Sequence, residues 1–320
     1  MDTRKALVLG ANGRFGMAMV QALRERGWQV RAQTRAGWRG EGRVEEVHCD
    51  GHDRAAILAA ARGCQVVAHA LNPSQYTQAC WRRDALPMLD NAIAAAQAAG
   101  ALLLLPGTVY NFGSSLPATL TEGTPAAPGH VFGAIRIEME RRLATAPGLD
   151  SFVLTAGDFF GQGTGVWFDK VIAAGLQRGV FTYPGPLDSV HAWTHLADLA
   201  EAFARLADQR AGIRGFNRMM MPGHDLTGRQ LQEALQRVLG RPLRARALPW
   251  GWLGLMRPFS PMLRSMWGNR YLWRRPHALD GRALRARLGD WTPTPLDTAL
   301  AQSLRQLGQE VAAEGGACAA

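Results

Sequence analysis

The stretch KALVLGANGRFG, residues 5–16, decides the fold. An apolar run, a glycine-rich turn and the start of a helical pattern follow one another in it. Gly10 allows a tight turn, Gly13 lets the backbone approach a pyrophosphate, and Gly16 permits close packing of the helix on the strand. The N–H groups at the start of a helix attract anions. We therefore predict a dinucleotide-binding turn, with a merely structural turn as the alternative.

Short apolar runs alternate with helical stretches through the first half of the chain. We expect strands at 6–9, 29–33, 44–49, 65–70, 102–105 and 151–155, and helices at 15–26, 54–61, within 75–99 and at 131–146. Parallel strands joined by crossover helices predict an α/β fold with a Rossmann doubly wound parallel sheet. Residues 1–160 would form the NAD(P)-binding domain and residues 161–320 a smaller C-terminal substrate-binding domain, with a return of the chain to the first domain around 190–220 as a further option. In the second half we expect helices at 167–178, 196–207, 228–239 and 298–312.

Composition excludes several classes of protein. A chain of 320 residues that is 47% hydrophobic can fill a core, which excludes disordered and fibrous proteins. The four cysteines, Cys318 among them, show no C-x-x-C pairing, and the longest apolar stretch, residues 92–105, is interrupted by Gln97 and Gly100. We expect a reduced cytoplasmic protein with no transmembrane segment.

The net charge of +10 comes from arginine, because Lys5 and Lys170 are the only lysines. The arginines are scattered, and no nucleic-acid-binding motif accompanies them. We expect a solvated basic surface with sites for anionic small molecules, and no nucleic-acid partner. A nucleic-acid or acidic-membrane face is the alternative.

The end of the second expected strand predicts the cofactor. An acidic residue there would bind a ribose 2′-hydroxyl, whereas an arginine would meet a 2′-phosphate. The chain has no carboxylate at this point but has Arg35, and Arg14 adds a second positive group, so NADP(H) is favoured over NAD(H). A simply solvated Arg35 is the alternative. Asp50 is expected to contact adenine or to stabilise its loop, and Asp53 to cap a helix.

An ordered set of motifs resembles the atypical branch of the extended short-chain dehydrogenase/reductase superfamily, the NAD-dependent epimerase/dehydratase-like proteins. The motifs are 10–16, 49–50 with Asp53, 67–70, 106–113, 157–161 and 191–200. Ligands of such sheets lie at the carboxyl ends of the strands. The expected cofactor contacts are Gly10, Asn12, Gly13, Arg14, Phe15, Gly16, Arg35, Asp50, Ala70 and Leu71.

The resemblance implies a catalytic Tyr-x-x-x-Lys pair that this chain lacks. The matching positions are Phe132 and Arg136, and none of the four tyrosines has a lysine four residues later. Arg136 could hold the nicotinamide ribose, but its high pKa makes it a poor proton shuttle. If the enzyme is a reductase, Tyr110 or water would supply the proton, and Thr108 is the nearest hydroxyl. The alternative is that Tyr110 packs or shapes the pocket.

A pair of histidines and a tryptophan-rich segment are two further candidates for a functional site. His191 and His195 have the spacing of metal ligands on one face of a helix, but no carboxylate in the H-E-x-x-H arrangement accompanies them, so no metal site is expected. The Trp- and Met-rich segment 250–273 is expected to be core. Its alternatives are an apolar pocket wall or a membrane-contacting surface.

The leading hypothesis is an NADP(H)-binding reductase of a carbonyl or related group on an apolar small molecule. A sugar-nucleotide epimerase or dehydratase that depends on NAD is one alternative, and a non-catalytic NAD(P)H-sensing regulatory protein is another. The resemblance implies a homodimer face on the helices near 75–99 and 131–146.

Overall fold

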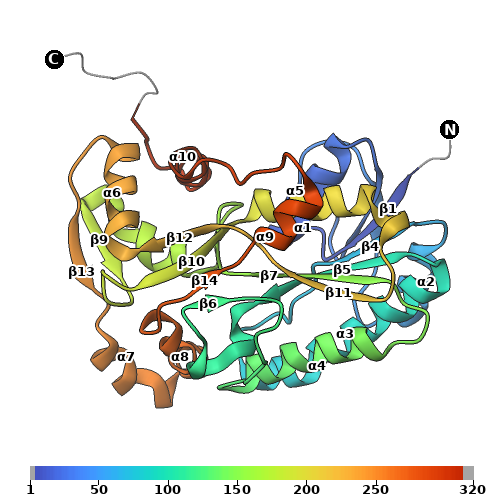
Figure 1. The fold of residues 1–320 in the computed structure, drawn as a ribbon, viewed down its shortest axis with the longest axis horizontal. Coiled ribbons are helices and arrows are strands. Elements are labelled where there is room, and N and C mark those ends of the chain that lie inside the picture. Colours follow the sequence, from blue (N-terminus) through green and yellow to red (C-terminus); the bar gives the residue numbers. More distant parts are fainter. Residues whose placement is uncertain (1–3, 313–320) are drawn as a thin grey trace.

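A seven-stranded parallel sheet forms the centre of the computed structural model, which describes residues 4–312 (Figure 1). The strand order is β11-β7-β5-β4-β1-β2-β3, and each neighbouring pair runs parallel. The strands are β1 Lys5–Leu9, β2 Gln29–Thr34, β3 Glu45–His48, β4 Val66–His69, β5 Leu102–Thr108, β7 Ser151–Ala156 and β11 Phe216–Met220. The six expected strands and the expected α/β Rossmann fold are confirmed. The seventh strand, β11, comes from the second half of the chain and pairs with β7.

Helices cover both faces of this sheet (Figure 1). The two on one face are α1 Arg14–Glu25 and α5 Leu196–Asp208, and the three on the other are α2 Arg54–Ala61, α3 Gln78–Ala99 and α4 Val131–Thr145. Each helix buries the apolar stripe that its sequence predicted, and alternate residues of the strands point to the two faces. Leu7 and Leu9 enter the core under α2 and α3, whereas Ala6 and Val8 enter the core under α1 and α5.

The rest of the second half builds a smaller layer over one end of the sheet. Three small sheets belong to this layer, and β6 and β8 of the first half take part in them. They are β8 Asp158–Phe160 with β10 Val190–His195 and β12 His224–Thr227, β9 Val180–Tyr183 with β13 Arg244–Ala247, and β6 Thr119–Leu120 with β14 Ala278–Leu279. Its α-helices are α6 Gly228–Leu239, α7 Trp250–Met256, α8 Pro261–Gly268 and α10 Leu296–Gln306. The helix α9 Arg282–Leu288 packs instead against α5 and β11 of the main sheet. Shorter helical turns are η1 Val109–Ser115, η2 Phe168–Ile172, η3 Ala173–Arg178, η4 Arg210–Gly212, η5 Arg257–Phe259 and η6 Arg270–Trp273.

Three expectations for the second half were wrong in detail. The helix expected at 167–178 is a π turn followed by a 3-10 turn, η2 and η3. His191 and His195 lie on strand β10 and not on a helix. The segment 250–273 is core only toward its end: Leu272 and Trp273 are buried, while α7 has no buried residue.

The described residues give two further results. None of their helices is long and apolar enough to cross a membrane. Cys49, Cys64 and Cys80 are free thiols, whereas Cys318 lies outside the described residues.

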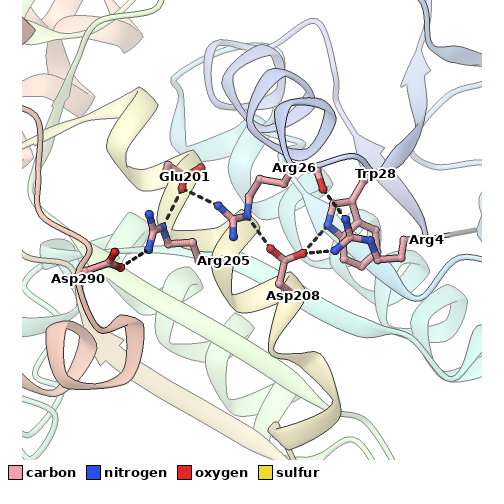
Figure 2. Close-up of polar contacts among 7 residues, drawn as sticks. All are labelled: Arg4, Arg26, Trp28, Glu201, Arg205, Asp208 and Asp290. Atoms are coloured by element: carbon pink, nitrogen blue, oxygen red, sulfur yellow. Dashed lines mark hydrogen bonds and ion pairs between the residues drawn. The ribbon is translucent and has the colours of Figure 1, made fainter.

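Asp208, at the end of α5, joins the two halves of the chain electrostatically (Figure 2). Its carboxylate accepts from Arg4 at 2.7 Å, from Arg26 at 2.6 Å and from the Trp28 indole at 2.9 Å. Arg26 also contacts Glu201 at 3.1 Å. The start of β1, the end of α1 and the start of β2 are therefore held to α5 through one side chain.

Replacing Asp208 with asparagine should lower the free energy of unfolding by about 1.5–3 kcal/mol, because the two guanidinium groups lose a charged acceptor and one of its two oxygens becomes an NH₂ donor. Equilibrium unfolding in urea measures the change. The control is Asp297→Asn, since Asp297 pairs with Arg237 at the surface and such pairs contribute about 0–1 kcal/mol. Equal effects of the two substitutions would show that the Asp208 contacts add nothing beyond a surface ion pair.

Candidate functional site

The glycine turn between β1 and α1 leaves no room for a side chain at Gly10 or at Gly16. Gly10 has a φ of +78°, and a Cβ there would lie 2.9 Å from the carbonyl carbon of Ala70. A Cβ at Gly16 would lie 2.2 Å from the carbonyl oxygen of Gly10. Gly13 is the N-cap of α1 and supplies no side-chain cap, so the helix start is available to an anion.

Two amide side chains fix the strand ends around this turn. The Gln33 side chain accepts from the Gly10 N–H at 2.8 Å and donates to the Cys49 carbonyl at 2.6 Å. The Asn12 side chain donates to the Gly37 carbonyl at 2.6 Å and accepts from the Arg39 N–H at 3.0 Å. Asn12 therefore holds the loop after β2 against the glycine turn. Gln33 was missed from sequence, where its only signal was an amide side chain at the end of a buried strand.

The positive groups near the turn are divided between two places. Arg35 and Arg39 are exposed, and neither side chain has a hydrogen bond or ion pair within residues 4–312. Arg14 points elsewhere: it donates to the carbonyls of Gly161 and Gln162, the latter at 2.9 Å, and lies 3.7 Å from Asp169. The role expected for Arg14 beside Arg35 was therefore wrong, because its guanidinium ties the turn to the second half of the chain.

The remaining residues expected at the cofactor have varied environments. Phe15 is buried against Phe203 of α5, with ring centroids 5.6 Å apart, so its side chain belongs to the core under α1 and α5. Asp50 is exposed and accepts from the His52 N–H at 2.8 Å. Asp53 caps α2 as expected, accepting from Ala56 at 3.0 Å.

Leu71 follows β4 and lies beside the loop that begins at Asp50. A Cβ at Gly51 would lie 2.8 Å from the Leu71 side chain. Ala70 lies against Gly10, so the ends of β1, β3 and β4 meet at one edge of the sheet. The structure brings together the residues predicted there, except for the side chains of Arg14 and Phe15.

A second cluster of polar side chains lies beyond the end of β5. The Thr108 hydroxyl accepts from the Tyr110 N–H at 3.4 Å and so caps η1, which carries Tyr110. The His130 side chain caps α4 by accepting from the Phe132 N–H at 3.0 Å. Its ring lies 6.0 Å from Tyr110 and 5.9 Å from Tyr271. Sequence reasoning had not placed His130, although it directly precedes an expected helix.

Phe132, at the position of the family's tyrosine, packs against a tyrosine from another element. The rings of Phe132 and Tyr76 stack with centroids 4.5 Å apart and an interplanar angle of 12°. Trp81 meets both rings edge-on. Arg136 lies over Trp81 at 5.0 Å and donates to Asn72 at 3.1 Å. Burial lowers the pKa of Arg136.

The Tyr76 hydroxyl accepts a hydrogen bond from the Asn269 side-chain amide. The neighbouring Tyr110 hydroxyl also influences the pKa of Tyr76. Having accepted from Asn269, the Tyr76 hydroxyl keeps its own proton for another partner. Burial raises the pKa of Tyr76, and Asp158 adds to this effect. Burial also raises the pKa of Tyr110, with Tyr76 and Asp158 contributing.

Two histidines with lowered pKa values, His69 and His130, and the hydrogen-bonded pair of His191 and Asp158 belong to the same part of the structure. Burial, with the positive charge of Arg136, lowers the pKa of His69 to about 3. Burial alone lowers the pKa of His130 to about 4. His191 lies 2.9 Å from the Asp158 carboxylate and stacks on Trp273 with centroids 4.2 Å apart. No group of three His, Cys, Asp or Glu side chains in the described part of the chain could hold a metal ion.

Comparison with known proteins identifies the family. The model of the NAD dependent epimerase/dehydratase family matches residues 6–217. A 3-diazoavenalumate denitrifying reductase from Streptomyces sp. is 28% identical over 224 residues, which cover 65% of this chain and 73% of that protein. An epimerase family protein from Bos taurus is 27% identical over 253 residues, which cover 74% of this chain and 81% of that protein. The solved UDP-glucose 4-epimerase from Brucella ovis in complex with NAD has a TM-score of 0.77 at 17% identity, covering 97% of this chain and 100% of that one. The chain belongs to the NAD dependent epimerase/dehydratase family.

Proposed function

We propose that the protein is an NADPH-dependent reductase that acts on a carbonyl or related group of an apolar small molecule. The observation that carries this proposal is the Tyr76 phenol, whose ring stacks on Phe132 at the position of the family's tyrosine and whose hydroxyl accepts from Asn269. A phenol thus lies next to that position, supplied by the segment before α3. The name of the reductase from Streptomyces sp. supports the same class of reaction.

The residues around the glycine turn fit a phosphorylated dinucleotide. The uncapped start of α1 offers N–H groups to a pyrophosphate, and Gly10 and Gly16 leave room for close approach of the backbone. Arg35 and Arg39, whose side chains have no partner within the described residues, offer guanidinium groups at the end of β2, where a 2′-phosphate would be bound. When bound, NADPH supplies the hydride for the reduction.

The tyrosine pair would supply the proton. An alkoxide formed from the substrate carbonyl is a stronger base than a phenolate, so it would take the proton of the Tyr76 hydroxyl. Asn269 would then stabilise the resulting Tyr76 phenolate by the hydrogen bond it already donates, and the neighbouring Tyr110 hydroxyl would add to this by donating a second one. Solvent would return the proton to Tyr76 at the end of the cycle. Arg136 would hold its place by its contacts with Asn72 and Pro106 and would transfer no proton.

The proposal predicts which cofactor binds. Replacing Arg35 with alanine should raise the Kd of NADPH roughly 10–100-fold, because a hydrogen bond between charged groups contributes about 1.5–3 kcal/mol. The Kd of NADH should change less than about threefold, because NADH lacks the 2′-phosphate. Titration followed by cofactor fluorescence measures both constants.

The matched control is Arg62→Ala. Arg62 is exposed at the end of α2, at the opposite edge of the sheet, so this substitution should leave both constants unchanged. A wild-type protein that binds NADH more tightly than NADPH would contradict the proposed cofactor. Binding of neither would contradict the function as a whole.

A further inference from the structure

The hairpin of α7 and α8, residues 250–268, carries large apolar side chains on the surface. Figure 1 shows both helices at the lower left edge of the molecule, below β9 and β13. The exposed apolar residues are Trp252, Leu255, Met256, Phe259 and Met262. Trp252 is 72% exposed and Phe259 is 81% exposed. Such a contiguous apolar stretch on a surface marks an interaction site.

The exposure follows from how the hairpin packs on itself. Trp250 meets Trp267 edge-on at 5.9 Å, and a Cβ at Gly254 would lie 2.6 Å from the Trp267 ring. This face of α7 is therefore closed against α8. Trp252 and Leu255 stand on the other face, at the i and i+3 positions of one helical stripe, with Met256 beside them at i+4.

The same region is strongly basic. Between residues 234 and 279 the sequence has no aspartate and no glutamate. The arginines in this stretch are Arg237, Arg241, Arg244, Arg246, Arg257, Arg264, Arg270, Arg274 and Arg275. Two of them, Arg257 and Arg264, line a cavity of about 350 Å³ together with Pro258 and Trp267. Neither of these two forms an ion pair with any carboxylate in the described residues.

We propose that the α7–α8 hairpin attaches the protein to a membrane surface that contains anionic phospholipids. Its apolar side chains would enter the boundary between headgroups and acyl chains, as those of interfacial amphipathic segments do. Arg257 and Arg264 would bind headgroup phosphates, whose geometry the planar guanidinium matches. This inference goes beyond the proposed reductase activity and does not depend on it.

Charge favours a membrane over a second copy of the chain. A symmetric contact between two hairpins would bring the same patch of each copy together. Arg257 and Arg264 of both copies would then lie close, with no acidic residue of the 234–279 stretch to offset them. An anionic bilayer offers the opposite sign of charge over the whole patch.

Co-sedimentation with vesicles tests the proposal. The wild-type protein should bind vesicles of phosphatidylcholine mixed with phosphatidylglycerol, should bind pure phosphatidylcholine much less, and should be released by salt. The double substitution Arg257→Gln with Arg264→Gln should lower the partition coefficient about 25-fold, since each arginine at an anionic surface contributes about fivefold. The double substitution Trp252→Gln with Phe259→Gln should lower it at least about tenfold.

A matched control removes two charges elsewhere. Arg62→Gln with Arg82→Gln changes two exposed arginines on the helices next to β4, and it should leave the partition coefficient near the wild-type value. Circular dichroism establishes that each variant is folded. The proposal is overturned if the wild type fails to sediment with anionic vesicles, or if the apolar variant binds as well as the wild type. It is equally overturned if sedimentation velocity shows a dimer that the apolar variant dissociates.

Discussion

Replacing Tyr76 with phenylalanine should lower kcat for NADPH-dependent reduction by about 10²–10⁴, the usual contribution of a positioned proton donor. The substitution removes one hydroxyl and keeps the ring that stacks on Phe132. Cofactor binding and the fold should therefore remain, and KM should change little. The measurement is NADPH oxidation with a panel of apolar aldehydes, ketones and quinones, together with the Kd of NADPH.

Tyr110→Phe should have a smaller effect, a fall in kcat of about tenfold. In the proposed mechanism Tyr110 acts on the substrate only through Tyr76, whose phenolate it would stabilise by one hydrogen bond, and one such bond contributes about 1–1.5 kcal/mol. Tyr183→Phe is the control, because Tyr183 is a buried residue of the second-half core that stacks on Phe181. It should retain the kcat of the wild type.

The outcomes separate the candidate functions. A larger loss for Tyr110→Phe than for Tyr76→Phe would make Tyr110 the donor, as the sequence alone had indicated. A wild-type protein that binds NADPH but oxidises it with no member of the panel would favour the sensing protein, for which the missing Tyr-x-x-x-Lys pair is the main argument.

Local sequence signals predicted the nucleotide-binding half because each of its elements carries its own pattern. The run at residues 6–9 became β1, and the helix expected at 54–61 begins and ends at those residues, with Asp53 as its cap. The glycine turn was predictable for the same reason, since Gly10 and Gly16 are required by backbone contacts within a dozen residues of the turn or at the adjacent strand. Constraints of this short range can be recognised as local sequence patterns.

The tyrosine site could not be predicted, because it is assembled from distant segments. Tyr76 precedes α3, whereas Asn269, which donates to its hydroxyl, follows α8. Distant contacts also decide the position of Arg14. Its place in the glycine turn indicated a phosphate contact, but its guanidinium donates instead to the carbonyls of residues 161 and 162. A contact between residues more than a hundred positions apart produces no local sequence pattern from which it could be predicted.

The apolar segment from Trp250 to Trp273 shows a different limit. A run of tryptophan and methionine predicts burial, because such side chains dominate cores. The structure buries Trp273 but leaves Trp252 and Phe259 exposed, since the inner face of the hairpin is already filled by Trp250 and Trp267. The composition of a segment shows that its apolar side chains favour burial. It does not show whether they are buried inside the protein or against a partner.

Replacing Gly16 with alanine should raise the Kd of NADPH more than about 100-fold and lower the free energy of unfolding by about 3 kcal/mol. The new Cβ would lie 2.2 Å from the Gly10 oxygen and 2.8 Å from the Ala11 oxygen, both of them backbone atoms. Gly10 cannot yield, because Ala70 lies behind it and Gln33 holds its N–H. The start of α1 must therefore move away from the turn, and its N–H groups move with it.

Gly212→Ala is the matched control, because a Cβ at Gly212 meets no atom within 4 Å and this glycine has no positive φ. Both the Kd and the unfolding free energy should stay at their wild-type values. For Gly16→Ala, the Kd of NADPH and the free energy of unfolding together distinguish loss of the cofactor site from loss of the folded state. Weak binding by a variant that urea unfolding shows to be native at the assay temperature places the pyrophosphate at the start of α1. Unchanged NADPH binding by a destabilised variant would mean that the cofactor does not use this turn, and that Gly16 serves only the packing of α1 on β1.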